Sequence, residues 1–324
     1  MKVLILGGGG FIGPRVMQRL VDRGHEVATM DINTNSPMLE PLKGRVEVMR
    51  GDVTLFDDVI DAVIQTKPDR IINLAYLLGF RPDGVTDAQD PHYAVRINIL
   101  GMDNAFEAAR LCGVKRVVYA SSLAVYGRQS FYGERPLTED DIRMGSGVYA
   151  ASKIYNEHQA EWFNKAYDME IIGIRPANVT GPDKVRGSMD HVRVITEPAR
   201  GLPVSFPFKD SMRLPIHVDD ISEMFTRVTL AEKTQHAVYN SGGETISMGD
   251  IAALVQKYLP DAKIDFEKES GGRELSGNYM MDNARMVQEF EYDLAPYPQR
   301  VLEIINAVRA DEGLPPVNAQ DSRR

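Results

Sequence analysis

Cysteine is almost missing from this chain of 324 residues. Cys112 is the only one, so no intrachain disulfide can form and a zinc cage built from cysteines is excluded. No apolar run approaches the ~18 residues that a membrane span needs. The run after Met1 is cut short by glycines before it could serve as a signal peptide. We therefore expect a cytoplasmic protein with no membrane partner and no metal site.

Positive charge is also in short supply. The chain has 37 Lys and Arg against 46 Asp and Glu, which gives a formal net charge of -9. Nucleic acids and anionic membranes need a basic face, so neither is expected as a partner. The length suits one large domain with a smaller one beside it.

Glycine, by contrast, is concentrated near the N-terminus. Residues 3–6 form a short apolar run, typical of a strand buried on both faces of a parallel sheet. Gly7, Gly10 and Gly13 follow, and a helix-like stretch comes next. This spacing permits a tight turn, close approach to a phosphate and close packing of helix on strand, with a pyrophosphate at the helix N-terminus. The alternative is a glycine turn without a ligand.

Acidic residues end the second and third strand-like runs. Asp31 follows residues 26–30, and its carboxylate can accept both hydroxyls of an adenosine ribose while repelling a 2′-phosphate. No Lys or Arg follows before Lys43, so NAD is favoured over NADP. Asp52 ends the next run, where ligands of such sheets collect; its alternative role is to cap the helix expected over 56–66, for which Thr54 is also suited.

Strand-like and helix-like stretches alternate through the first half, which predicts a doubly wound parallel sheet. The expected strands are residues 3–6, 26–30, 45–50, 70–75 and 117–122. We expect a cofactor domain over 1–175 and a mainly substrate-binding domain over 176–324, with about 214–245 returning to the first. The irregular segment 76–91, which includes Phe80, Arg81 and Asp83, is predicted to be a binding loop.

The sequence pattern predicts two further helices. Residues 93–111 predict one continuous helix that contains Asn98. Another helix is expected to begin after Ile216 and His217, and Asp219 or Asp220 is expected to cap it.

Tyr149 and Lys153 stand four residues apart at the start of a helix-like stretch. Positions i and i+4 lie on one helix face, so the phenol would lie beside the ammonium. A neighbouring positive charge lowers a tyrosine pKa from its ordinary value near ~10, which would make Tyr149 a base near neutral pH. The alternative is a solvated helix face.

Several motifs together resemble those of one known family, the extended short-chain dehydrogenases/reductases, also called the NAD-dependent epimerase/dehydratase group. The group includes nucleotide-sugar 4-epimerases. The motifs are Gly7-x-x-Gly10-x-x-Gly13, Asp31, Gly51-Asp52-Val53, Asn73-Leu74-Ala75, Asp90-Pro91 with Asn98, Ser121 to Gly127, Tyr149-x-x-x-Lys153, Arg175 to Pro182, Arg213 to Asp220 and Tyr239 to Gly243. The resemblance implies a Rossmann-type doubly wound sheet with a smaller C-terminal α/β substrate domain.

The resemblance also implies a catalytic set. Ser122, rather than Ser121, occupies the position of the family's serine, and Tyr149 and Lys153 complete the set. Tyr149 would take a hydroxyl proton as hydride leaves for nicotinamide, and Ser122 would donate to the oxygen that becomes a carbonyl. Asn98 falls where family members support the lysine through water.

Further positions are implied for binding. The NAD set implied by the resemblance is Gly7, Gly10, Phe11, Ile12, Gly13, Asp31, Asp52, Val53, Leu74, Ala75, Tyr149, Lys153 and Pro176. The substrate set is Ser122, Asn178, Arg213 and Arg273. The two arginines would converge on a diphosphate, and the alternative is that both form surface ion pairs. Thr180 departs from the family's Tyr or Phe.

Leu123 and Ala124 narrow the reaction. They stand where the family's dehydratases and decarboxylases carry acidic residues, and neither side chain can transfer a proton. Dehydration and decarboxylation are therefore disfavoured, and oxidation, reduction and epimerisation remain as possible reactions. We expect an NAD-dependent oxidoreductase or epimerase acting on a secondary alcohol of a sugar-like substrate. The alternatives are a dehydrogenase of a small polyol, hydroxy acid or other alcohol, and a non-catalytic NAD-sensing protein. The resemblance also implies a homodimer through the helices that carry Tyr149 and Asn98, and Trp162 and Phe163 are either core or interface residues.

Overall fold

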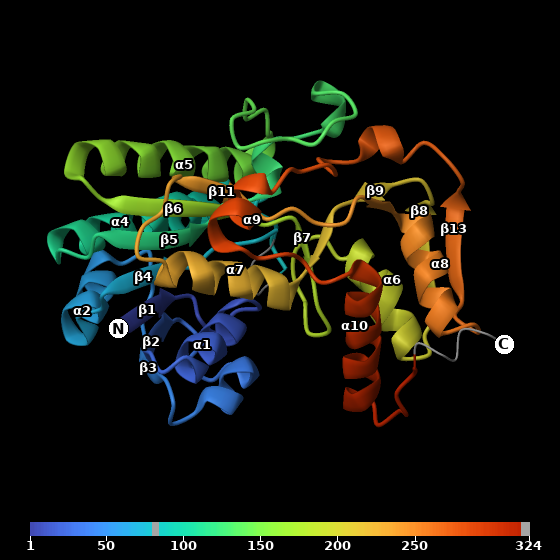
Figure 1. Ribbon diagram of the computed structural model, residues 1–324, viewed down its shortest axis with the longest axis horizontal. Coiled ribbons are helices and arrows are strands. Elements are labelled where there is room, and N and C mark those ends of the chain that lie inside the picture. Colours follow the sequence, from blue (N-terminus) through green and yellow to red (C-terminus); the bar gives the residue numbers. More distant parts are fainter. Residues whose placement is uncertain (80–83, 319–324) are drawn as a thin grey trace.

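Seven parallel strands form the central sheet of the computed structural model, which describes residues 1–79 and 84–318 (Figure 1). Their order across the sheet is β11-β6-β5-β4-β1-β2-β3. The strands are β1 (Lys2–Leu6), β2 (Glu26–Asp31), β3 (Glu47–Arg50), β4 (Arg70–Asn73), β5 (Arg116–Ala120), β6 (Glu170–Arg175) and β11 (Val238–Asn240). Strand order reverses between β1 and β4, which opens a crevice at their carboxyl ends. The predicted Rossmann-type sheet is confirmed.

Both faces of this sheet are covered by helices. In β1, Val3 and Ile5 join the core on one face, and Leu4 and Leu6 join the core on the other, as the period of two in a strand requires. The first face packs against α1 (Gly13–Asp22), α7 (Val218–Leu230) and α9 (Ala284–Phe290). The second packs against α2 (Phe56–Thr66), α4 (Gly101–Leu111) and α5 (Gly147–Tyr167). Continuous apolar strands therefore serve two cores at once.

The helix expected over 93–111 is continuous and contains a π-helical turn at Asn98. The segment is α3 (Pro91–Val95), a π-helical turn over Arg96–Leu100, and then α4. The Asn98 side chain bonds both backbone groups of Leu77, and its own carbonyl accepts from Asn156 Nδ2 at 3.0 Å. The predicted single helix is confirmed, and the tertiary hydrogen bonds of Asn98 accompany a wider, π-helical turn within it.

A smaller group of elements lies beside the sheet (Figure 1). Its core joins α6 (Asp190–Ala199), α8 (Met248–Tyr258) and α10 (Tyr297–Asp311) to β8 (Val204–Phe208) and β13 (Ile264–Lys268). Two short pairs connect the parts: β7 (Asn178–Thr180) with β10 (Pro215–His217), and β9 (Met212–Arg213) with β12 (Ile246–Ser247). No helix within 1–79 and 84–318 is long and apolar enough to cross a membrane.

The N-terminus of α7 differs from the prediction. His217 is the cap, and its Nδ1 accepts the N–H of Asp219 at 3.2 Å. The Asp219 carboxylate pairs with Arg15 of α1, and Asp220 accepts from Arg300 of α10. The predicted capping by either carboxylate was wrong because arginines of neighbouring helices engage both.

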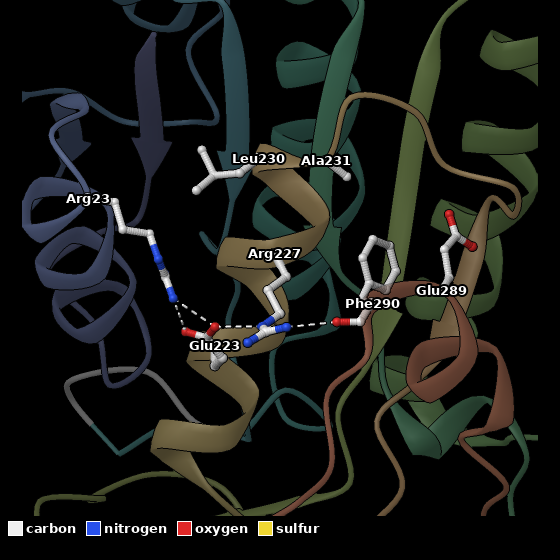
Figure 2. Close-up of a pocket in the computed structure, with 7 residues that line it drawn as sticks. All are labelled: Arg23, Glu223, Arg227, Leu230, Ala231, Glu289 and Phe290. Carbon is white, nitrogen blue, oxygen red and sulfur yellow. Dashed lines mark hydrogen bonds and ion pairs between the residues drawn. The ribbon is translucent and has the colours of Figure 1, made fainter.

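Helix α7 is tied to α1 and to α9 by a partly buried ion cluster, shown in Figure 2. Glu223 accepts from Arg23 at 2.8 Å and from Arg227 at 2.6 Å. Arg227 also donates to the carbonyl of Phe290 at 2.7 Å. A helix from the second half of the chain is thus bound to the helix that follows β1.

A buried ion pair fastens α5 to β6. Glu157 is 0% exposed and Arg175 is 2% exposed, and two hydrogen bonds of 2.8 Å join them. Ser121 also donates to Glu157, and Arg143 pairs with it at 2.9 Å. The carboxylate is therefore fully satisfied, as a charge at this depth must be.

Removing this charge should destabilise the protein strongly. We expect Glu157→Gln to lower the free energy of unfolding by about 3 kcal/mol or more, because Arg175 is left buried without its counter-ion. Urea unfolding followed by circular dichroism measures the change. Glu161→Gln is the matched control: Glu161 is on the same helix and also pairs with Arg143, but its side chain is 51% exposed. It should lose less than about 1 kcal/mol. Equal losses in the two variants would refute the special role of Glu157.

Candidate functional site

The glycine turn lies at the crevice where the strand order reverses. Gly7 has φ +78, and a Cβ there would come within 2.6 Å of the Ala75 backbone, so only glycine fits. A Cβ at Gly13 would collide with the Gly8 carbonyl. Both glycines are explained by packing within the chain.

Gly10 is different. It is exposed, and a Cβ there would meet Gly7 O at an ordinary 3.6 Å. Chain packing therefore does not demand glycine at this position, whereas close approach of a pyrophosphate to the backbone would. The residues fit NAD at this point.

Asp31 lies at the end of β2, beside the turn. Its Oδ2 accepts from Gly9 N at 2.9 Å, and its Oδ1 accepts from Asn33 N at 2.9 Å. A carboxylate offers about four acceptor positions, so room remains for ribose hydroxyls. Asp31 both shapes the glycine turn and presents acceptors at its edge.

Phe11 and Ile12 lead from the turn into α1. The Phe11 ring lies so close to Gly181 that a Cβ at Gly181 would be 2.7 Å from it. Ile12 packs against the core on the α1 face of the sheet. Arg15 donates to the Phe11 carbonyl at 3.2 Å and pairs with Asp183 at 2.8 Å. The glycine turn is thus joined to the segment after β7.

Asp52 and Val53 lie after β3. Asp52 Oδ1 accepts from Thr54 N at 2.8 Å, which closes a turn before α2. The N-cap position of α2 is Leu55, without a side-chain cap, so neither Asp52 nor Thr54 caps that helix. Val53 is buried, and its carbonyl accepts from Asn104 at 2.8 Å.

Leu74, Ala75 and Pro176 lie at the carboxyl ends of β4 and β6. Leu74 N donates to Leu6 O at 2.9 Å, and Ala75 borders Gly7. The Pro176 carbonyl accepts from Leu123 N at 3.0 Å. These residues surround one edge of the sheet, the edge where the glycine turn lies.

Two neighbouring serines at the end of β5 have different partners. The Ser121 hydroxyl donates to Glu157 at 2.5 Å. The Ser122 hydroxyl accepts from Ala124 N at 3.1 Å and lies close enough to the Tyr149 phenol to lower its pKa. The structure therefore brings Ser122 and Tyr149 together and leaves Ser121 in the buried ion network.

Lys153 lies one turn beyond Tyr149 on α5 and is 1% exposed. Its Nζ donates to the Ala120 carbonyl at 2.5 Å and lies 3.2 Å from the centroid of the Tyr76 ring. The Tyr149 ring centroid is 5.6 Å away. Burial lowers the pKa of Lys153 well below its ordinary value, and the charge of Glu157 opposes that shift.

The expected direction of the Tyr149 pKa was wrong. Burial raises the pKa of Tyr149, and the nearby Ser122 hydroxyl offsets this rise only in part. Lys153 does not dominate because its own charge is disfavoured by burial and its ammonium is directed to Ala120 and Tyr76. The four-residue spacing correctly predicted that Tyr149 and Lys153 lie near each other. Burial, however, decided the direction in which the Tyr149 pKa shifts.

The side chain of Asn98 meets the site through the backbone of Leu77. Its Oδ1 accepts from Leu77 N at 2.7 Å, and its Nδ2 donates to Leu77 O at 3.1 Å. It thereby fixes the segment after Ala75. The expected link to Lys153 through water remains a prediction.

Tyr76 was missed by the sequence argument, which placed it in a loop. Its ring meets that of Tyr149 edge to face, with centroids 5.5 Å apart and an interplanar angle of 84°. An aromatic residue directly after the Asn73-Leu74-Ala75 motif was the available signal. Residues 80–83 of the predicted binding loop, including Phe80, Arg81 and Asp83, lie outside the described residues.

The predicted substrate residues are not gathered at one point by their contacts. Asn178 Oδ1 accepts from Leu214 N at 2.9 Å, which joins β7 to the segment before β10. Arg213 pairs with Asp190 at 3.4 Å, whereas Arg273 pairs with Glu134 at 2.8 Å and is half exposed. For Arg273 the surface ion pair is therefore what the structure shows.

A second basic residue accompanies Arg213. Lys184 donates to Val179 O at 2.8 Å and to Ser188 O at 3.0 Å, and its Nζ lies 3.4 Å from His191 Nε2. Burial lowers the pKa of Lys184 to about 8. Burial lowers the pKa of His191 well below its ordinary value, and the charges of Lys184 and Arg213 add to that shift. The run Lys184, Arg186, His191 and Arg193 was a visible signal that the sequence argument did not use.

Leu123 and Ala124 form a 3-10 turn directly after Ser122. Neither can transfer a proton. Among the residues that the structure describes, no cluster of three or more His, Cys, Asp or Glu is placed to hold a metal ion.

Two solved structures share this fold. UDP-glucose 4-epimerase of Thermus thermophilus, in complex with NAD, superposes with a TM-score of 0.82 at 23% identity, over 95% of this chain and 99% of that chain. L-threonine dehydrogenase of Clostridium difficile superposes with a TM-score of 0.82 at 18% identity, over 97% and 99%. At these identities the likeness establishes the fold.

Sequence comparison establishes the family. UDP-glucose 4-epimerase of Mycolicibacterium smegmatis is 30% identical over 236 residues, which are 70% of this chain and 72% of that protein. Residues 3–242 match the profile of the NAD dependent epimerase/dehydratase family. The resemblance drawn from the motifs is confirmed: the chain belongs to the NAD-dependent epimerase/dehydratase family, and it is an enzyme whose cofactor is NAD.

Proposed function

We propose that this enzyme oxidises a secondary alcohol of a sugar-like substrate, with Tyr149 as the base, and either returns the hydride as an epimerase or releases it as a dehydrogenase. The observation that carries the proposal is the grouping of Ser122, directly after β5, with Tyr149 and with Lys153, whose Nζ lies 5.6 Å from the centroid of the Tyr149 ring. This group lies at the carboxyl edge of the sheet that also carries the glycine turn.

NAD supplies the hydride acceptor when it is bound. Gly7 and Gly10 with the N-terminus of α1 would hold its pyrophosphate, and Asp31 would hold the adenosine ribose. Leu74, Ala75 and Pro176 would line the cofactor crevice between them.

The protein's own groups handle the proton. Tyr149 would accept it from the substrate hydroxyl, and Ser122 would donate a hydrogen bond to the oxygen as it becomes a carbonyl. Because burial raises the pKa of Tyr149, the phenolate depends on Ser122 and on the positive charge of Lys153. Leu123 and Ala124 offer no second acid, which argues against dehydration and decarboxylation.

The substrate should carry a negative charge. Lys184 and Arg213 flank His191 near the start of α6, next to Asn178 on β7. Basic groups there suit either the diphosphate of a nucleotide sugar or the carboxylate of a hydroxy acid. The engagement of Arg273 by Glu134 weakens the case for a two-arginine diphosphate clamp. A smaller dehydrogenase substrate is therefore retained as the second candidate.

We also propose that residues 176–324 form mainly the substrate-binding part, with about 214–245 belonging to the cofactor domain, and that the protein forms a homodimer through α4 and α5. On α5, Trp162 is 61% exposed and Phe163 is buried, so Trp162 is the residue free to lie in that interface. The presence of Ser122, Tyr149 and Lys153 near one another argues against a non-catalytic NAD sensor.

Loss of the phenol should stop turnover. We expect Tyr149→Phe to lower kcat by about a thousandfold or more while NAD affinity changes less than about twofold, because only the proton acceptor is removed. Steady-state assays and NAD titration by fluorescence measure the two quantities. Tyr155→Phe, a half-exposed tyrosine on the same helix, is the control and should keep full activity. Full activity in the Tyr149 variant would sink the assignment.

A substrate panel separates the two reactions. UDP- and dTDP-sugars, free sugars, sugar acids and simple secondary alcohols would be tested for NADH absorbance and for a change in epimer ratio. An epimerase should change the ratio without net NADH, and a dehydrogenase should accumulate NADH. Turnover of a free alcohol with no response to any nucleotide sugar would remove the epimerase from consideration.

Lys184 should leave a pH signature on stability. Its pKa is about 8 in the folded chain against the ordinary 10.5, so between these values the unfolded chain binds a proton that the folded chain does not. Stability should therefore rise with pH over that interval in the wild type relative to Lys184→Met. Urea unfolding of both proteins at pH 7.5, 9 and 10 tests this. A constant difference between them would contradict the burial of a titrating amine.

A further inference from the structure

Tyr76 touches both members of the Tyr149–Lys153 pair, yet the proposed chemistry gives it no part. The Lys153 ammonium lies 3.2 Å from the centroid of its ring. The Tyr149 ring meets it edge to face at 5.5 Å. Its ring is therefore the one aromatic surface, among the described residues, in contact with both.

The backbone on both sides of Tyr76 is held in place. Ala75 N donates to Asn73 Oδ1 at 3.0 Å. Leu77 is bonded through both its N–H and its carbonyl to the side chain of Asn98, which is itself 0% exposed. Asn156 of α5 donates to the Asn98 carbonyl at 3.0 Å. The position of the ring is thus set by β4, the π-helical turn and α5 together.

The hydroxyl of Tyr76 does not account for this placement. It lies near Ser152 and Asn156 on α5, but within the described residues it is buried without a hydrogen-bond partner of good geometry. The ring face is the part of the side chain with a definite partner. An ammonium over an aromatic face is attracted by the ring quadrupole, and the attraction grows when the pair is desolvated.

The groups that face Lys153 show what the ring adds. From α5 it meets Tyr149 and the charge of Glu157, and from β5 it meets the Ala120 carbonyl. Tyr76 faces it from the segment after β4. Glu157 is already committed to Arg175 and Arg143. A carboxylate in place of Tyr76 would add a negative charge that cancels the effect of the Lys153 ammonium on the Tyr149 phenol. A ring face also favours the charged form of Lys153, but it adds no negative charge.

We propose that Tyr76 is a positioning residue: its ring face holds Lys153 in the charged form and fixes the ammonium relative to the Tyr149 phenol. The inference deepens the proposed function and rests on it for the role of Tyr149. Asn98 acts in the same arrangement by fixing the segment that carries Tyr76.

Two substitutions separate the ring from the hydroxyl. Tyr76→Phe keeps the ring and should keep kcat/KM within about twofold of the wild type, with the same pH profile. Tyr76→Leu removes the ring and should lower kcat/KM about tenfold at neutral pH. The rising limb of the pH profile of kcat/KM should move to higher pH in Tyr76→Leu. The reason is that a neutral Lys153 no longer lowers the pKa of Tyr149. A loss in Tyr76→Phe as large as in Tyr76→Leu would overturn the role of the ring face.

A second readout does not depend on activity. In protein labelled with 13C at lysine Cε, the Lys153 signal is identified by its loss in Lys153→Met and is titrated by NMR. The pKa of Lys153 should be lower in Tyr76→Leu than in the wild type and Tyr76→Phe. Tyr76→Met, which also lacks a ring but adapts its shape, replaces the leucine variant if that variant does not fold.

The outcomes can be told apart. Activity retained by Tyr149→Phe would remove the proposed function, while the Lys153 titration would still report on Tyr76. An inactive Tyr149→Phe together with an unchanged pH profile and an unchanged Lys153 pKa in Tyr76→Leu would overturn the inference alone.

Discussion

The buried ion pair between Glu157 and Arg175 fixes α5 against the sheet, and the geometry of the site depends on it. Tyr149, Lys153 and Glu157 follow each other at intervals of four residues, so one helix face carries both the residues of the proposed chemistry and their structural support. The end of β5 meets that face twice, with Ser121 bonded to Glu157 and Ser122 beside the Tyr149 phenol. Because a charge pair at this depth tolerates little displacement, the phenol and the ammonium start from a fixed position.

Burial governs the charges around this helix. It raises the pKa of Tyr149 and lowers those of Lys153 and Lys184. Both lysines are held by neutral acceptors, backbone carbonyls in each case and for Lys153 also the ring of Tyr76. With neutral partners, the positive charge of each lysine stays available to a phenolate or an anionic substrate. A carboxylate partner would cancel that charge.

The cofactor crevice and the segment beyond β7 are mechanically connected. Arg15 bonds the Phe11 carbonyl of the glycine turn and pairs with Asp183 and Asp219. Phe11 itself lies against Gly181. Glu223 then joins α7 to α1 through Arg23. Residues on the proposed substrate side are therefore held at a fixed distance from the turn that is proposed to bind the pyrophosphate.

The sequence by itself determined the parallel sheet, the glycine turn, the bounds of α2 and the shared helix face of Tyr149 and Lys153. These follow from local periodicity and backbone sterics, which neighbouring residues decide. Tertiary structure decided the π-helical turn at Asn98, the capping of α7 by His217, the contact of Tyr76 with Lys153 and the separate partners of Arg213 and Arg273. It also decided the direction of the Tyr149 pKa. Each of these depends on burial or on partners distant in the chain, and no local pattern encodes how deeply a side chain is buried or which distant group it meets.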